Sequence, residues 1–171
     1  MKIIEAMKRV KMNKDKIADL RKRIAASSAN LSIETPLYEN TKEKIAEWLQ
    51  ACTDTSQDNV GLLVSIQRTN LATPVSIEIG GKQVTKSIAE WVWRRREYAK
   101  MDMETWAHLT DRNLREQRVQ QSTGAEPLEI KLIRHYDPAA RDEKLALYRD
   151  EPHIIDAALE IVNATTELIE A

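Results

Sequence analysis

The sequence predicts a mainly α protein: a long antiparallel helical hairpin or bundle with a small β-hairpin insertion and a C-terminal arm made of a strand and helices. First, a β-branched aliphatic residue recurs every seven positions, as in a helix packed along a narrow seam; these positions are Ile3, Val10, Ile17 and Ile24. Second, Gly80-Gly81 separates two short segments of the kind that form paired strands. Third, charged residues make up 31% of the chain and aromatic residues only 5%, which is typical of long solvated helices. Such helices need partners that cover their apolar stripes.

The first helix is predicted over residues 2–28, with an edge like that of a coiled coil. Its other face is strongly basic and carries Lys8, Arg9, Lys11, Lys14, Lys16, Arg21, Lys22 and Arg23. A solvated helix face explains these charges better than a nucleic-acid site does, because the aromatic residues on which single-stranded bases stack are missing.

The second helix is predicted over residues 36–70. Thr35 can cap its start, and Pro36 fits the first turn, where a missing N–H costs nothing. The apolar positions with helical spacing are Tyr38, Ile45, Trp48, Leu49, Cys52, Leu62, Leu63 and Ile66. A polar run from Thr53 to Asn59 interrupts them and weakens the expected seam.

A β-hairpin is predicted at residues 75–84. The segment 75–79 alternates apolar and polar residues, and Gly80-Gly81 suits a type I′ turn because both central positions of that turn need positive φ. The segment 82–84 then returns antiparallel to the first strand. A lone hairpin is marginally stable, so this one must pack on the helices or on another chain.

A third helix is predicted from Thr85 or Ser87 to about residue 120, and Ser87 and Glu90 form the pattern of a capping box. Residues 124–127 then form a plausible joint. We therefore expect two parts, a long-helix bundle over residues 1–122 and an assembly arm over residues 123–171. The arm is predicted to hold a strand at 128–132, a helix over 137–148 and another from residue 152.

The densest local feature is the segment from Trp91 to Tyr98, which contains two tryptophans and three arginines. Tryptophan and arginine are enriched where interfaces carry their binding energy, so the segment favours an oligomer interface. Packing within the chain and a contact with nucleic acid are the alternatives. The predicted interface residues, including those of the C-terminal arm, are Trp91, Trp93, Arg94, Arg95, Tyr98, Leu128, Ile130, Leu132, Tyr136, Ile155 and Leu159.

No catalytic, cofactor or metal site is predicted. Three histidines and the single Cys52 are too few and too scattered for a metal site. Gly80-Gly81 lacks the Lys-Ser/Thr sequel of a phosphate-binding loop. The net charge of −1 gives no general attraction to nucleic acid, and no apolar run approaches the length of a membrane span. We expect a non-enzymatic protein without a membrane partner.

Three segments carry a family resemblance: Met1-Lys2-Ile3 before a basic helix, residues 66–70 at the end of the second helix, and residues 81–85 before the third. In order and spacing they resemble the septicolysin-like family of small helical bacterial proteins, which also occur in phage and prophage genomes. The resemblance covers residues 1 to about 115. No motif supports the toxin-like family name, and the strand is longer than the family's connection. The segment from Glu126 to Ala171 lies outside the resemblance.

The resemblance and the added segment together imply a structural protein that forms a homo-oligomer, as a component of a bacteriophage virion. Neighbouring virion proteins are then further partners, and assembly takes place in the host cytoplasm. The alternative is a nucleic-acid-binding accessory protein of the bacterial cytoplasm that uses its basic helix faces; nucleic acid is the less favoured partner.

Overall fold

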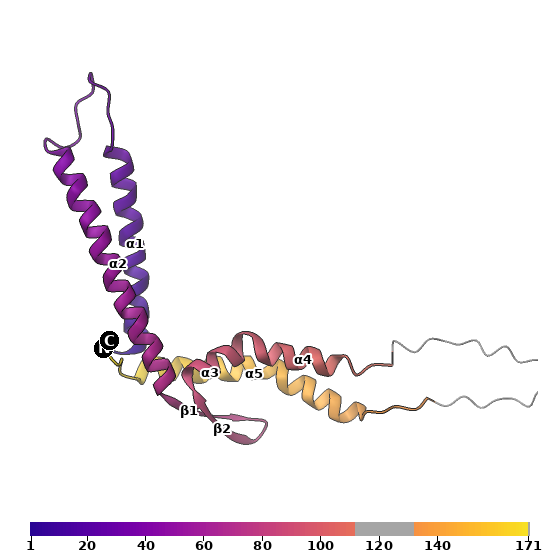
Figure 1. Ribbon diagram of the computed structural model, residues 1–171. Helices are drawn as coiled ribbons and strands as arrows, with labels where there is room; N and C mark the ends of the chain where they lie inside the picture. The colour runs from indigo at the N-terminus through magenta and orange to yellow at the C-terminus, as the bar shows by residue number, and fades with distance from the viewer. Residues whose placement is uncertain (112–131, 171) are drawn as a thin grey trace, which may run out of the picture.

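The computed structural model describes residues 1–111 and 132–170, and it confirms a mainly α protein with a two-stranded antiparallel hairpin. Figure 1 shows two arms that meet at a corner. The long arm consists of α1 (Ile3–Ser27) and α2 (Thr41–Ala72). The second arm contains α3 (Ile88–Trp93), the π-helix η1 (Arg94–Tyr98) and α4 (Ala99–Ala107), which run beside α5 (Pro138–Thr165). Both termini lie at the corner.

The long arm follows the predicted seam of α1, in which Ile3, Val10 and Ile17 are buried. The start of α2 was predicted wrongly, because the helix begins at Thr41 rather than at residue 36. Residues 31–40 are all exposed at the tip of the arm. A first helical turn has no surface to pack on there. The capping residues alone do not offset the free-energy cost of helix nucleation.

The β-hairpin is confirmed and is longer than predicted. Strand β1 (Pro74–Ile79) pairs with β2 (Lys82–Ser87), and Ile77 lies opposite Val84. Gly80 and Gly81 have φ of 58° and 73°, as a type I′ turn requires. Ser76 and Thr85 add a cross-strand hydrogen bond of 2.6 Å between their hydroxyl oxygens. One face of the hairpin packs on the core.

The second arm begins with the predicted capping box. The Ser87 N–H donates to Glu90 Oε2 at 2.8 Å, and the Glu90 N–H donates to Ser87 Oγ. The hydrogen bond from the Ser87 backbone lowers the pKa of Glu90. The helical segment ends at Ala107 and not at the predicted residue 120. Residues 112–131 lie outside the described part of the chain.

Helix α5 corrects the prediction of two C-terminal helices. It starts as expected, with Asp137 Oδ1 accepting a hydrogen bond from the Ala139 N–H and Pro138 in the first turn. It then continues through Pro152 to Thr165. Proline removes one helical hydrogen bond, but Glu151 and Ile155 on either side are buried against the rest of the second arm. Tertiary packing therefore keeps the helix unbroken.

The main core lies at the corner and consists of Ile3, Ile77, Ile88, Trp91, Ile155 and Leu159. It draws on α1, β1, α3 and α5 together. The two ends of the chain are joined there, with the Leu168 N–H donating to the Met1 carbonyl at 2.7 Å. The division at residue 122 stays a prediction; within the described residues, α5 shares this core with the N-terminal helix. Of the predicted strand at 128–132, only Leu132 is described, and it is not in a strand.

Candidate functional site

The buried residues of α2 are all polar: Thr55, Asn59, Ser65 and Thr69. Side-chain hydrogen bonds within the long arm are made by Thr55, Asn59 and Thr69. Thr69 Oγ1 also accepts a hydrogen bond of 2.9 Å from the Ile169 N–H. Asn59 Oδ1 accepts a hydrogen bond of 2.9 Å from Asn13 Nδ2 of α1, and Asn59 Nδ2 reaches the Val10 carbonyl at 3.4 Å. The hydroxyls of Thr55 and Thr69 donate to the carbonyls four residues earlier. Between α1 and α2, these polar contacts therefore add to the apolar seam that contains Val10 and Ile17.

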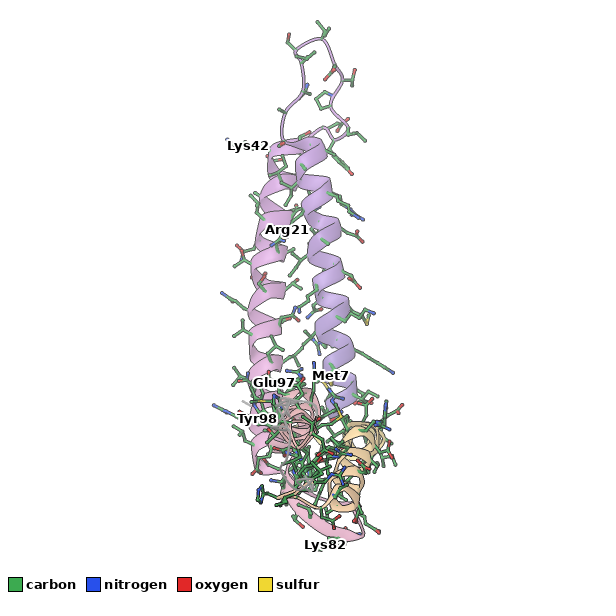
Figure 2. All side chains as sticks on the ribbon, turned by 90° about the vertical axis from the view of Figure 1, so that its right-hand side faces the viewer. Met7, Arg21, Lys42, Lys82, Glu97 and Tyr98 are labelled. Carbon is green, nitrogen blue, oxygen red and sulfur yellow. The ribbon has the colours of Figure 1, made fainter. Side chains whose placement is uncertain are left out.

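The exposed surface of α2 carries several large apolar side chains beside charged residues such as Glu47, Asp54 and Asp58. Its large side chains keep 53% of their surface exposed at Leu49, 60% at Val60, 44% at Leu63, 37% at Val64 and 70% at Leu71. α2 therefore exposes more large apolar surface than a helix that is stable by itself in a monomer, although it also half-buries Trp48, Cys52, Leu62 and Ile66. Figure 2 shows the long arm extending away from the second arm, with side chains of both its helices open to solvent.

We call one set of residues on this face the α2 stripe: Ile45, Leu49, Thr53, Ser56, Val60, Leu63, Gln67 and Leu71. At about 100° per residue, all of them lie within about 40° of one line along the helix. None is charged, and all except the half-buried Ile45 are exposed. Sequence analysis missed this surface because it assigned Ile45, Leu49 and Leu63 to a buried seam. The signal was the polar run from Thr53 to Asn59, which lies partly on the buried side.

An ion-pair cluster lies in the second arm, where η1 meets α5. Arg94 Nε and Nη2 donate to the two carboxylate oxygens of Glu151 at 2.6 and 2.8 Å, and Arg94 Nη1 also binds Asp102. The guanidinium lies 5.4 Å from the centre of the Tyr148 ring. The hydrogen bond with Glu151 raises the pKa of Arg94. This paired, forked geometry anchors α5 and leaves Arg94 without a free side for an external phosphate or carboxylate.

The other predicted interface residues of the segment from Trp91 to Tyr98 differ in burial. Trp91 is buried in the core, where its Nε1–H donates to the Val75 carbonyl at 2.9 Å. Arg95 forms an ion pair with Asp156 of α5. Trp93 and Tyr98 remain exposed and line an open hollow of about 440 Å³. Figure 2 places Tyr98 on the side of the second arm nearer to α2.

Ile155 and Leu159, predicted as interface residues, are buried inside the chain's own core. Like Trp91, they present no free side-chain surface in the single chain, and their role in an interface stays a prediction. Leu132 is exposed, whereas Leu128 and Ile130 lie outside the described residues.

Tyr136 belongs to a polar cluster near the far end of the second arm. Its hydroxyl donates to Asp111 Oδ1 at 2.8 Å, and Arg134 donates to Asp111 Oδ2 from two nitrogens at 2.8 and 2.6 Å. These bonds, that from Arg134 first, lower the pKa of Asp111. The cluster joins the chain on either side of residues 112–131 and positions Tyr136 within the subunit.

The inner corner between the arms holds a hollow of about 350 Å³, lined mainly by apolar side chains such as Met7, Leu63 and Val92. Asn70 Oδ1 is buried at its edge and accepts no hydrogen bond from the described residues. Over residues 1–111 and 132–170, no group of three acidic, histidine or cysteine side chains could hold a metal ion. Within the same ranges, no helix combines the length and hydrophobicity needed to cross a membrane.

Comparison with protein-family models gives no match for this chain. Comparison with curated proteins also gives no match. Among solved structures, the chain is similar to the crystal structure of a functionally unknown conserved protein from Corynebacterium diphtheriae, with a TM-score of 0.57 and 19% sequence identity over 99% of each chain. At this identity the similarity shows the fold alone. Because the similarity spans both chains almost completely, α5 belongs to the shared fold.

Proposed function

We propose that this protein is a non-enzymatic structural protein that assembles with copies of itself. The observation that carries the proposal is the exposed apolar surface of α2, a helix whose fully buried residues are all polar. Contiguous apolar surface is uncommon on monomeric proteins and marks interaction sites. In the described part of the chain, twenty large apolar side chains are exposed, whereas ten hydrophobic residues are buried. The chain's own core therefore accounts for a minority of its apolar residues.

The bacteriophage particle, and neighbouring virion proteins as further partners, stay predictions from the sequence. Self-assembly does not depend on that setting, since it rests on the helix surfaces of the subunit. An elongated subunit with two exposed arms can contact several copies at once, which suits a ring or a lattice.

The test is light scattering after size-exclusion chromatography. We expect the full chain to run as a defined multiple of 19.6 kDa at micromolar concentrations. Val60→Glu should shift it toward the monomer, because a carboxylate on the α2 stripe would lose its hydration in the interface. Met12→Glu is the matched control: it makes an equivalent change at an exposed position of α1 and should leave the mass unchanged. A monomeric full chain would refute the proposal.

A second candidate is nucleic-acid binding by α1, because the eight basic residues of its first-helix face are all exposed. Among the described ion pairs, only Lys22 of these eight is engaged, with Asp19 at 3.6 Å. The version of this function that also used Arg94 and Arg95 is weakened, since both are held by acidic residues of the chain itself.

Anisotropy titrations with labelled DNA at two salt concentrations test this candidate. Binding through phosphates should weaken steeply with salt, and a Lys14→Gln and Arg21→Gln variant should bind more weakly with a shallower salt dependence. Absence of binding at low salt would exclude it.

A further inference from the structure

The loop at the tip of the long arm, residues 31–40, exposes four large apolar side chains: Leu31, Ile33, Leu37 and Tyr38. Ile33 and Leu37 keep 89% and 81% of their surface exposed, more than any other large apolar residue among those described. The loop is held by its own hydrogen bonds. The Glu34 N–H donates to the Leu31 carbonyl at 2.9 Å, and the Leu31 N–H donates to Glu34 Oε2 at 3.0 Å. An ordered loop with such exposed apolar side chains has the character of a contact surface.

The inner corner at the other end of the long arm holds two adjoining hollows. One is the hollow of about 350 Å³ described above, and the other, of about 460 Å³, lies between α1 and α5. Met7, Arg95, Leu159 and Asn163 line both hollows, so the two are continuous, and we call them together the corner depression. Figure 2 looks into this corner from the side of the second arm, with Met7 at the foot of the long arm.

The tip and the corner depression carry opposite charges. Glu34 and Glu39 are the charged residues of the tip, and no lysine or arginine occurs from residue 24 to 41. The corner depression is lined by four basic and two acidic residues: Lys8, Lys11, Arg95, Arg96, Asp156 and Glu160. Arg95 is paired with Asp156. The other three cations take part in none of the ion pairs found among the described residues, so they can bind carboxylates from outside.

A buried acceptor at the edge of the depression also lacks a donor. Asn70 Oδ1 is the buried side-chain atom that accepts no hydrogen bond from the described residues. A backbone N–H or a hydroxyl of a docked loop would satisfy it, whereas a purely apolar molecule would leave it unsatisfied. The depression therefore suits an occupant that combines apolar side chains, carboxylates and hydrogen-bond donors, as the tip does.

We infer that the tip of the long arm of one subunit docks in the corner depression of a second copy of this chain. This inference rests on the proposed self-assembly and names its two surfaces. The tip and the corner lie at opposite ends of the same long arm (Figure 1), so a chain cannot fill its own corner with its own tip. Because the two surfaces differ, the contact is head-to-tail, and its repetition closes a ring if the rotation between subunits allows it.

The docked tip lies at the C-terminal end of the α2 stripe. Leu63 of the stripe lines the hollow of about 350 Å³, and Val60 lies about one turn earlier on the same stripe. A carboxylate introduced at position 60 would therefore stand beside the acidic tip of the neighbouring copy. The effect expected above for Val60→Glu follows from this contact.

The area of the contact favours a ring over an isolated pair. Interface residues bury on average about 30–40 Å² each, so the ten residues of the tip bury about 300–400 Å². This is less than the ~800 Å² that each partner buries in a stable interface. In a ring, each subunit uses both its tip and its corner, and its two contacts together bury an area close to that value.

Chemical cross-linking tests the contact, because it traps a neighbour without disturbing the assembly. The native thiol is first removed by Cys52→Ser. Two chains are then prepared in this background, one with Leu37→Cys in the tip and one with Met7→Cys in the corner, distinguished by a short tag. A short bis-maleimide reagent is added to each chain alone and to an equimolar mixture. Ile161→Cys replaces Met7→Cys in the matched control, because Ile161 is 67% exposed and lines neither hollow.

We expect the mixture of tip and corner chains to give several-fold more covalent dimer than either chain alone, with both tags in the dimer. The mixture of tip and control chains should give little dimer. A chain that carries both Leu37→Cys and Met7→Cys should give a ladder of longer covalent products, since each subunit then has a link at both ends. Equal yields with the corner and the control chains would overturn the inference.

Charge reversal tests the basis of recognition. Lys8→Glu with Arg96→Glu in the corner chain should lower the yield of the mixed dimer several-fold, because the acidic tip then meets acidic residues. Both side chains are exposed and outside the described ion pairs, so the fold should tolerate the change, which circular dichroism checks. An unchanged yield in a folded variant would overturn the docking of an acidic tip on a basic corner.

Light scattering on the Cys52→Ser chains separates the two proposals. A defined oligomer without preferential linkage of tip and corner would leave self-assembly intact but would place it on other surfaces, which overturns this contact. A monomer would refute self-assembly and, with it, the docking of the tip.

Discussion

The two arms of the molecule are stabilised in different ways. At the corner and along the second arm, large apolar side chains such as Trp91 and Ile155 are fully buried, and the Arg94–Glu151 pair adds a forked ionic contact. Along the outer part of the long arm, α2 buries threonine, serine and asparagine and leaves leucine and valine exposed. We therefore expect most of the folding free energy to come from the corner core, whereas α2 leaves apolar side chains exposed to solvent.

Under the proposed self-assembly, partner subunits would cover the apolar surface that the long arm leaves exposed. In a helix that is stable alone, the apolar stripe faces the chain's own core. In the long arm, hydrogen bonds such as Asn13 to Asn59 fix the register of α2 on α1, beside the buried Val10 and Ile17 of α1. Substitutions at the corner should lower the free energy of unfolding, whereas substitutions on the α2 stripe should weaken association between copies.

The largest effect is expected from Trp91→Ala. This change opens a cavity in the corner core and removes the hydrogen bond to Val75, so it should lower the free energy of unfolding by about 3–5 kcal/mol. Trp93 is the matched control, because it is 52% exposed where Trp91 is 1% exposed. Trp93→Ala should cost no more than about 1 kcal/mol. Urea denaturation of both variants measures the difference, and equal losses would contradict a core concentrated at the corner.

A smaller loss is expected from Arg94→Met. The change leaves the Glu151 carboxylate, whose side chain is 4% exposed, without its bidentate partner, and it should cost about 3 kcal/mol. The double variant Arg94→Met with Glu151→Leu removes both charges and should recover much of that loss. Arg95→Met is the control, since its partner Asp156 is mostly exposed and such pairs contribute about 1 kcal/mol or less. If the double variant were no more stable than the single one, the cost would come from packing rather than from an unpaired charge.

The elements whose structure depends on local chemistry were predicted correctly. The seven-residue seam of α1, the Gly80-Gly81 turn and the capping box of Ser87 and Glu90 were all predicted, because each depends on residues within one or two turns of chain. The helix break predicted at Pro152 was wrong, because contacts between distant segments override the local helix-breaking preference of proline there.

The exposed α2 stripe was not predicted, for a related reason. The rule that apolar positions face inward assigns Leu49 and Leu63 to the chain's interior, but the interior of α2 is taken by Thr55 and Asn59. A single sequence shows a helical stripe and its period, yet the stripe alone does not say whether α1 or another chain covers it. Similarly, the tryptophan pair at Trp91 and Trp93 predicts one inward and one outward ring without naming which is which.

The smallest effect, and the one that examines the long arm itself, is expected from Gly61→Ala. Gly61 lies within α2, and an added Cβ there would meet nothing within 4 Å. Alanine should stabilise the helix by about 1 kcal/mol, because it lowers the entropy lost on folding without a steric cost. Gly81 is the matched control: it has the same open surroundings but a φ of +73°, so Gly81→Ala should destabilise by about 1 kcal/mol.

Hydrogen exchange is the measurement that locates this effect. Because the outer part of α2 has little apolar core beneath it, its amides should exchange through local opening rather than through global unfolding. Gly61→Ala should then slow exchange in α2 while leaving the amides around Trp91 unchanged. Equal slowing in both regions would mean that the long arm and the corner unfold as one unit, and the contrast between the arms would then concern polarity alone and not stability.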